Sequence, residues 1–166
     1  AQKMLLSGFG GNSKTSEEKF ERAMNPQHVA ISLDGEPTLY PKLAELVGEY
    51  HKRNFSTFVV SNGLLPERIE KLLEEPPTQL YISVDAPNEE LFNIIDRPII
   101  KNAWQGLMKT LSMLPKIREK SRTVLRFTLI KGMNMAFPEQ WAEIIKLSQP
   151  MFVEVKAYMW VGMSRE

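Results

Sequence analysis

The sequence has no cysteine and only two histidines, His28 and His51, among its 166 residues. Without thiols, this stretch can form no disulfide, hold no metal through thiolates and provide no cysteine nucleophile. The two imidazoles are also too few for a zinc site built mainly from histidine ligands. We therefore expect neither metal ligands nor catalytic residues within this stretch.

The chain also lacks an excess of either charge and lacks long hydrophobic runs. Lysine and arginine number 21, aspartate and glutamate number 20, and the formal net charge is +1. This near-balance provides no overall attraction for nucleic acid, although it leaves room for a local basic face. No run is long enough to cross a membrane, and no apolar amino-terminal segment resembles a signal peptide. With 43% hydrophobic and 25% charged residues, we expect a single globular domain over residues 1–166, cytoplasmic and without a membrane partner.

Several common catalytic and nucleotide-binding motifs are missing. There is no Gly-x-Ser-x-Gly elbow of a serine hydrolase, and no predicted strand is followed by a dinucleotide-binding glycine triplet. Residues 5–15 are rich in glycine and end in Lys-Thr, but Ser13 stands where a phosphate-binding loop needs glycine. We interpret this segment as a flexible turn. A helix should follow it, beginning with a capping box formed by Thr15 and Glu18.

Hydrophobic periodicity predicts five strands separated by helices. Short apolar runs rich in β-forming residues occupy 28–33, 55–61, 80–84, 124–130 and 152–158. Helical spacing lies between them, with helices expected from Pro41, from Pro66, over 89–95 and 103–114, and from Pro138. Strands that alternate with helices form parallel βαβ units with right-handed crossovers, so the expected fold class is α/β.

The last two strands favour a partial (β/α) barrel over a doubly wound flat sheet. Strands buried on both faces of a flat sheet are apolar almost throughout. The fourth strand alternates instead, with Leu125 and Phe127 on one face and Arg126 and Thr128 on the other. The fifth strand alternates in the same way: Val153, Val155 and Ala157 against Glu154, Lys156 and Tyr158. We expect helices to cover the apolar face and the polar face to line an interior that can hold a ligand.

The segment that joins the first strand to the next helix carries a carboxylate. After the apolar run at 28–33 the chain breaks at Gly35 and Pro37, with Glu36 between them. Parallel sheets and barrels bind their ligands at the carboxyl ends of the strands. Because proline has a fixed φ, Pro37 holds this loop stiffly. We therefore predict that Glu36 is presented at the ligand-binding edge in one orientation.

Polar residues follow each of the predicted strands, and in a parallel barrel they converge on one rim. The set contains acceptors for an ammonium group, cations for a carboxylate and neutral groups for a ribose, which suits a zwitterionic, nucleoside-like ligand. It comprises Glu36, Ser61, Asn62, Ser83, Asp85, Arg126, Thr128, Lys131, Lys156 and Tyr158.

Structural roles explain several of these residues about equally well. Arg126 and Glu154 lie on adjacent predicted strands and could pair as a buried bridge. Residues 61–63 are also typical of a tight turn, and residues 85–87 could cap the next helix. The succession of polar strand ends favours a ligand site over these separate explanations.

Residues 32–39, Ser-Leu-Asp-Gly-Glu-Pro-Thr-Leu, resemble the Gly-Glu-Pro segment that follows the second barrel strand of radical S-adenosylmethionine (SAM) enzymes. Further segments resemble one family of these enzymes, the tRNA 4-demethylwyosine synthases of wyosine biosynthesis. They are LLSGFGGN at 5–12, the stretch 28–41, SVDAP at 83–87, RFTLIKGMN at 126–134 and VEVKAYMWVGMSR at 153–165. The resemblance covers nearly the whole chain in the same order.

The resemblance implies a partial barrel of about the second to the sixth strand, with SAM bound at its rim. Glu36 would bind the SAM amino group, with Pro37 and Thr38 beside it. The SAM carboxylate, ribose and adenine would contact residues at later strand ends: Ser61, Asn62, Ser83, Asp85, Arg126, Thr128 and Tyr158. The candidates for contacts with substrate or tRNA are Lys131, Lys156, Arg97 and Arg165.

The resemblance also implies the activity of a complete enzyme. In such enzymes a 4Fe-4S cluster reductively cleaves SAM, and the resulting deoxyadenosyl radical abstracts hydrogen. This family joins pyruvate-derived carbons to N1-methylguanosine next to the anticodon of tRNA-Phe, which gives 4-demethylwyosine. The implied partners are tRNA, pyruvate and an electron donor, and the expected state is a monomer.

The sequence departs from this family in its missing cysteines. The CxxxCxxC loop that binds the cluster is absent, so we expect the cluster ligands in a missing amino-terminal part and this stretch alone to be inactive. Residues 96–98, Asp-Arg-Pro, also depart from the family, in which a cysteine often precedes Arg-Pro. Two alternatives remain open: a barrel without a cluster that binds SAM, a nucleoside or RNA, and a radical SAM enzyme with another substrate.

Overall fold

The computed structural model describes residues 2–162, which form one parallel sheet with helices between its strands. The strands are β1 (His28–Ile31), β2 (Ser56–Ser61), β3 (Gln79–Ser83), β4 (Arg122–Leu129) and β5 (Phe152–Ala157). The helices are α1 (Gln2–Leu6), α2 (Glu17–Met24), α3 (Leu43–His51), α4 (Pro66–Lys71), α5 (Glu89–Ile95), α6 (Ala103–Ile117) and α7 (Pro138–Ser148), with a short 3-10 helix, η1 (Pro37–Leu39). The strands pair in the order β1-β2-β3-β4-β5. The predicted α/β partial barrel is therefore confirmed.

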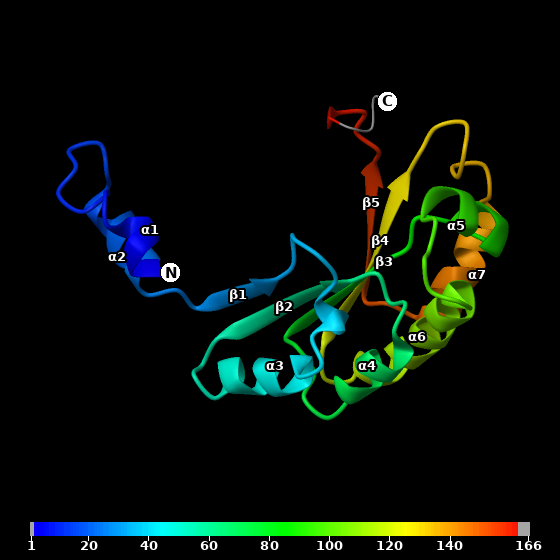
Figure 1. Cartoon of the computed structure of the whole chain (residues 1–166), viewed down its shortest axis with the longest axis horizontal. Helices are drawn as coiled ribbons and strands as arrows, with labels where there is room; N and C mark the ends of the chain where they lie inside the picture. Colours follow the sequence, from blue (N-terminus) through cyan, green and yellow to red (C-terminus); the bar gives the residue numbers. More distant parts are fainter. Residues whose placement is uncertain (1, 163–166) are drawn as a thin grey trace.

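The hydrophobic core lies between the sheet and helices α3, α4, α6 and α7, which line one of its faces (Figure 1). Both layers contribute buried side chains: Val47, Val59, Ile69, Leu72, Leu80, Ile82, Leu107, Leu111, Leu114 and Leu125. In β4, Leu125 and Phe127 point into this core, whereas Arg126 and Thr128 are half-buried on the opposite face. The alternation predicted for this strand is confirmed, and it leaves polar side chains on the open face of the sheet.

The expectation that helices cover the apolar face of the last strand is wrong. Val153 and Val155 pair in register with Leu125 and Phe127, so they lie on the same face of the sheet as the core. They are nevertheless 38% and 59% exposed. The reason is that β5 is an edge strand and, within the described residues, no helix follows it.

Helices α1 and α2 pack against each other and stand apart from the sheet, to which residues 25–27 join them (Figure 1). No residue of α2 is buried, so its apolar stripe adds nothing to the core beside the sheet. The sequence did not predict α1, whose last two residues fall within the segment 5–15 that was interpreted as a flexible turn. None of the helices between residues 2 and 162 combines the length and the apolar character needed to span a bilayer.

One predicted helix cap is wrong, and one alternative capping role is excluded. Ser16 rather than Thr15 caps α2, and its hydroxyl accepts a hydrogen bond from the N–H three residues later at 3.5 Å. Asn88 rather than Asp85 caps α5, where its Oδ1 accepts an equivalent bond at 2.9 Å. A capping side chain must stand directly before the first helical residue to reach that N–H. Asp85 is thereby left for another contact.

The helix expected from Pro41 begins later. Residues 37–39 first form η1, and α3 then starts at Leu43. Pro66 and Pro138 occupy the first turns of α4 and α7 as predicted. Proline suits that position because the first N–H groups of a helix have no partner within it. The extra turn after β1 is what shapes the loop around Glu36.

Candidate functional site

Glu36 lies in a hydrogen-bonded group at the carboxyl end of β1. It directly precedes η1 and caps it, because its Oε1 accepts the Thr38 N–H at 3.0 Å and the Thr38 hydroxyl at 2.7 Å. Pro37 occupies the first position of η1, where the missing N–H leaves no hydrogen bond unmade. The local sequence thus folds the Glu36 side chain back over its own loop.

The end of β2 supplies two more donors to the same carboxylate. The Ser61 hydroxyl donates to Glu36 Oε1 at 2.7 Å, and the Asn62 N–H donates to Oε2 at 2.8 Å. With the two bonds from Thr38, Glu36 Oε1 accepts three hydrogen bonds and Oε2 accepts one. Four of the predicted site residues are therefore brought together. Oε2 retains acceptor capacity for a further donor, such as an ammonium group.

The backbone between β1 and Glu36 twice adopts a positive φ. The angle is 92° at Leu33 and 77° at Gly35. Glycine adopts this conformation readily, whereas a residue with a bulky side chain does so rarely. The Leu33 side chain points into solvent. Unusual backbone conformations of this kind occur preferentially in loops that orient functional side chains.

A second group of predicted residues lies at the ends of β3 and β4. The Asp85 Oδ1 accepts the Thr128 N–H at 3.2 Å, and Ser83 pairs in register with Arg126. All of these residues are half-buried. Because β2 and β3 are neighbours and all strands run parallel, this group and the Glu36 group share one edge of the sheet.

Arg126 is held on the open face by an acid and an aromatic ring. Its Nε donates to Glu154 Oε2 at 3.2 Å, and its guanidinium carbon lies 5.0 Å from the centre of the Tyr81 ring, in a cation–π contact. The side chains of Arg126 and Glu154 are 26% and 38% exposed, so the pair is not a buried bridge. Within the described residues no hydrogen bond engages the terminal nitrogens, which leaves them available to a carboxylate. Tyr81 was not predicted, although alternation along β3 was a signal for its place on this face.

Asn134, which was also not predicted, ties the ends of β3 and β4 together. It is fully buried, and its Oδ1 accepts the Ile130 N–H at 2.6 Å. Its Nδ2 donates to the carbonyls of Asp85 and Thr128 at 2.7 and 2.8 Å. The local sequence offers no signal for this role, because the Asp85 carbonyl lies on a distant segment.

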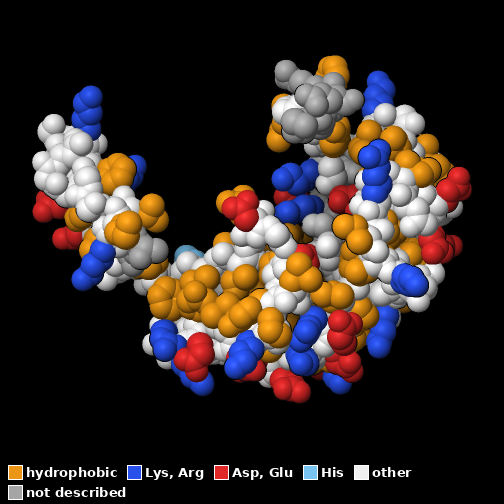
Figure 2. Space-filling model, viewed as in Figure 1, with side chains coloured by type: hydrophobic (Ala, Val, Ile, Leu, Met, Phe, Trp, Pro, Cys, Tyr) orange, Lys and Arg blue, Asp and Glu red, His pale blue; other side chains and the backbone are white. Residues whose placement is uncertain are grey.

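Lys156 and Tyr158 extend the site along β5. Lys156 pairs in register with Thr128 and is exposed. The Tyr158 N–H donates to the Leu129 carbonyl at 3.0 Å, and its side chain is 41% exposed. Lysine and arginine side chains gather beside β4 and β5 on the concave side of the molecule (Figure 2). This part of the edge is open and basic.

The remaining predicted cations are not drawn into either group. Lys131 is exposed in the loop after β4. Arg97 is exposed just after α5, where its Nε donates to the Ile94 carbonyl at 3.4 Å. Arg165 lies outside the described residues.

Asp96, at the end of α5, has an unusual acidity. Loss of hydration among the surrounding protein atoms, followed by the negative charge of Asp85, raises the pKa of the Asp96 carboxyl to about 7. The residue as a whole is exposed, so the direction of the shift rests on partial loss of hydration at the carboxyl group and on the charge of Asp85. Asp96 can therefore gain or lose a proton near neutral pH.

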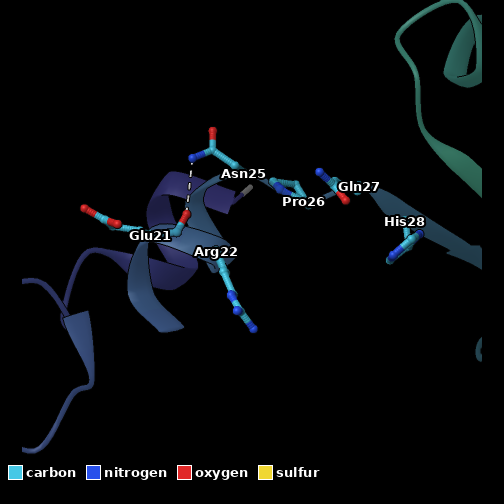
Figure 3. A pocket seen from close by; sticks show the side chains of 6 residues that line it. All are labelled: Glu21, Arg22, Asn25, Pro26, Gln27 and His28. Carbon is cyan, nitrogen blue, oxygen red and sulfur yellow. Dashed lines mark hydrogen bonds between the residues drawn. The ribbon is translucent and has the colours of Figure 1, made fainter. Parts of the chain in front are cut away.

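One surface hollow lies away from these polar groups, and another reaches Glu36. One of about 670 Å³ lies between α2 and the start of β1, where six side chains line it without converging (Figure 3). The hydrogen bond drawn there joins the Asn25 side chain to the Glu21 carbonyl at 3.2 Å. Another, of about 450 Å³, borders Glu36 on the side of β1 and α3. The candidate site is therefore the open carboxyl edge of the sheet and not a closed pocket.

Comparison with known protein families gives two matches. The radical SAM superfamily matches residues 15–147, and the wyosine base formation family matches residues 147–166. The first match includes β1 to β4, with both hydrogen-bonded groups of the site. The second includes β5, and its last four residues lie outside the described part of the chain.

The curated relatives described next share the name SAM-dependent tRNA 4-demethylwyosine synthase. The SAM-dependent tRNA 4-demethylwyosine synthase of Pyrococcus horikoshii is 50% identical over 99% of this chain and 48% of its own length. That of Methanocaldococcus jannaschii is 44% identical over 99% of this chain and 50% of its own length. The solved structure of TYW1 with a lysine-pyruvate adduct bound is 42% identical with a TM-score of 0.85, and the match covers 98% of this chain and 52% of that one. The chain thus spans about half the length of these relatives.

Proposed function

The chain belongs to the radical SAM superfamily, and from this premise we propose that it forms the SAM-binding core of a tRNA 4-demethylwyosine synthase. The observation that carries the proposal is the Glu36 carboxylate. Four hydrogen bonds from two elements hold it at the edge where parallel barrels bind ligands. The relatives support the identity of the enzyme, and because this chain spans only about half of them, the complete activity belongs to the proposal.

SAM fits the donors and acceptors of this edge. Its ammonium group matches the free capacity of Glu36 Oε2, and its carboxylate matches the terminal nitrogens of Arg126. Neutral and polar groups beside them suit the ribose and adenine. The proposed SAM-binding set is Glu36, Pro37, Thr38, Ser61, Asn62, Ser83, Asp85, Arg126, Thr128 and Tyr158.

A 4Fe-4S cluster does not fit the donors of this chain. The sequence contains no cysteine, and among residues 2–162 no cluster of His, Asp or Glu could hold a metal ion. We place the cluster ligands in the remainder of the longer protein, where the cluster would supply the electron that cleaves SAM. The residues described here would bind and orient SAM, and this chain alone would be inactive.

The proposed reaction joins pyruvate-derived carbons to N1-methylguanosine next to the anticodon of tRNA-Phe. The substrates are then pyruvate and tRNA, and an electron donor is also required. Lys131, Lys156, Arg97 and Arg165 are the proposed contacts with substrate or tRNA. The basic side chains beside β4 and β5 support this assignment (Figure 2). We propose that residues 1–166 form one barrel core of a cytoplasmic monomer.

The substitution Glu36→Gln tests the proposal. The substitution removes the charge that would bind the SAM ammonium group. It also replaces one carboxylate oxygen by an NH2 group, which cannot accept a hydrogen bond. We expect SAM affinity to fall about ten- to a hundred-fold, since hydrogen bonds to charged groups are worth about 1.5–3 kcal/mol. The domain should remain folded. Calorimetric titration of the full-length protein with SAM measures the affinity, and thermal unfolding measures the fold.

Glu45→Gln is the matched control for loss of one negative charge. Glu45 is exposed on α3 and pairs only loosely with Lys42, at 3.8 Å. We expect this variant to bind SAM as the parent does. Equal SAM affinity of the parent and of Glu36→Gln would rule out the proposed role of Glu36.

A barrel without a cluster, which binds SAM, a nucleoside or RNA, is the second candidate. It is favoured by the absence of cysteine, because such a protein would need no ligand beyond this chain. Iron content after anaerobic purification of the full-length protein separates the two. Bound iron supports the radical enzyme. An iron-free protein that still binds SAM supports the binding module.

A further inference from the structure

Helix α6 packs directly beneath the loop that follows β2. At Gly106 of α6, an added Cβ atom would lie 2.9 Å from the Leu64 carbonyl oxygen, closer than such atoms approach in proteins. At Gly63, φ is 70°, and an added Cβ would lie 3.0–3.2 Å from side chains that include Thr110 and Leu107 of α6. The backbone of this loop therefore packs so closely on the helix that neither position has room for a side chain.

A hydrogen bond joins the same two elements. Thr110 is fully buried, and its hydroxyl donates to the Gly63 carbonyl at 2.7 Å. A threonine hydroxyl inside a helix ordinarily bonds a carbonyl of its own helix, one turn back. Here it reaches a loop 47 residues earlier in the chain.

The hydrogen bonds continue from this loop to Glu36. The Gly63 N–H donates to the Ser61 hydroxyl oxygen at 3.0 Å, and the Ser61 hydroxyl donates to Glu36 Oε1 at 2.7 Å. The Asn62 N–H, between them in sequence, donates to Glu36 Oε2. A shift of the Gly63 peptide would therefore move two of the four donors that hold the carboxylate.

We propose that Thr110 is a positioning residue for the SAM site, acting through Gly63 and Ser61 on Glu36. It touches neither Glu36 nor the open edge, and its hydroxyl fixes the loop that carries the donors. The ligand in this proposal rests on the proposed function. The fixing of the loop does not, because it depends only on contacts within the chain. In a buried environment, neighbouring hydrogen bonds strengthen one another, so loss of one weakens the others in the series.

Thr110→Val tests the proposal in the full-length protein. Valine keeps the shape of threonine and removes the hydroxyl, so the Gly63 carbonyl loses its buried donor. We expect amide exchange of Asn62 and Gly63 to become faster, and SAM affinity to fall about five-fold, the effect of a typical single hydrogen bond. Thr110→Ser, which keeps the hydroxyl, should restore both. Hydrogen exchange and calorimetric titration with SAM are the two measurements.

Ser148→Ala is the matched control. Ser148 is also a buried hydroxyl on a helix, but it donates within α7, to the Ile144 carbonyl at 2.7 Å. The Ser148→Ala substitution should leave both the hydrogen exchange of Asn62 and Gly63 and the SAM affinity unchanged. Parent-like exchange and affinity in Thr110→Val would overturn the proposal, as would equal losses in Thr110→Val and Ser148→Ala. If the valine variant does not fold, Thr110→Ala decides in its place.

The two measurements also separate this inference from the proposed function. If the parent protein binds no SAM, the proposed function fails at this site. Faster exchange of Asn62 and Gly63 in Thr110→Val, restored by Thr110→Ser, would still show that Thr110 positions the Glu36 loop. Unchanged exchange would overturn the inference whether or not SAM binds.

Discussion

At the scale of single residues, the carboxylates of Glu36 and Asp96 have different surroundings, and these surroundings suit them to different roles. Glu36 is fixed by four hydrogen bonds and keeps acceptor capacity toward the open edge. Asp96 has lost hydration and lies near Asp85, which raises the pKa of its carboxyl to about 7. A carboxylate held in place suits binding of a cation. A carboxyl whose pKa is raised toward neutral pH leads us to expect that stability depends on pH.

We expect the stability of the chain to depend on pH through Asp96. Its pKa is about 7 in the folded chain against an ordinary value of 3.8, so the folded state holds this proton more tightly than the unfolded state. The stabilisation is complete below about pH 4 and is lost as the pH rises through about 7. Asp96→Asn cannot ionise, so its free energy of unfolding should fall less over this range. Urea denaturation at several pH values measures the difference.

The exposed Asp34 provides a control for this prediction. Asp34→Asn removes the same charge from the loop after β1, and we expect it to retain the pH dependence of the parent. If Asp96→Asn showed the same fall in unfolding free energy as the parent, Asp96 would not be the titrating group.

At the scale of elements, a few polar side chains join the ends of neighbouring strands. Asn134 bonds to the ends of β3 and β4 and accepts the indole N–H of Trp141, in α7, at 3.0 Å through its own carbonyl. Arg126 similarly links β4 to β5 through Glu154 and to β3 through Tyr81. These contacts set the spacing of the strand ends from which the proposed site is built.

Asn134→Ala should therefore destabilise the domain strongly. The substitution leaves the Ile130 N–H and two half-buried carbonyls, those of Asp85 and Thr128, without their partner. We expect a loss of about 2–4 kcal/mol, because each unsatisfied buried group costs about 1–3 kcal/mol and some will find water. Chemical denaturation measures the free energy of unfolding.

Asn93→Ala is the control for this prediction. Asn93 is exposed on α5, and surface substitutions usually change stability by less than about 0.5 kcal/mol. Similar losses in both variants would show that the buried contacts of Asn134 do not stabilise the strand ends.

At the scale of the whole molecule, the sheet is covered on one face and incompletely at its last strand. The core beneath β2, β3 and β4 is closed by helices, whereas the apolar face of β5 remains exposed. The opposite face has no helix over it (Figure 1) and carries Arg126 and Thr128, whereas Ser61 of the Glu36 group is buried on the core side of β2. This asymmetry distinguishes the strands that the helices bury from the exposed last strand.

The same substitution in two strands measures that asymmetry. Val59 in β2 is 0% exposed and Val155 in β5 is 59% exposed. In the 166-residue chain we expect Val59→Ala to lower the free energy of unfolding by about 2 kcal/mol, because it removes buried methyl groups and leaves a cavity. Val155→Ala should change it by less than about 0.5 kcal/mol. Equal losses in urea denaturation would contradict the exposure of β5.

The sequence by itself determined the order and kind of the elements. Period-two and helical patterns, together with proline and glycine at the breaks, are local features, and they located five strands and the helices between them. The polar residue after each strand predicted which edge would carry the site, because parallel strands all end on the same side. The structure places Glu36, Ser61 and Asn62 together there, while their role in binding SAM stays a prediction.

Only the tertiary structure decided which side chains meet. The bonds of Glu36 to Ser61 and of Thr110 to Gly63 join segments separated by many residues, and their geometry depends on strand register and on the helix that crosses between strands. The pairing of Arg126 with Glu154 was an alternative that the sequence offered, and the structure forms it in a half-buried position. The exposure of Val155 likewise follows from the place of β5 at the edge of the sheet. A pattern within one segment shows which way a side chain faces, but the partner it meets is set by another segment folded against it.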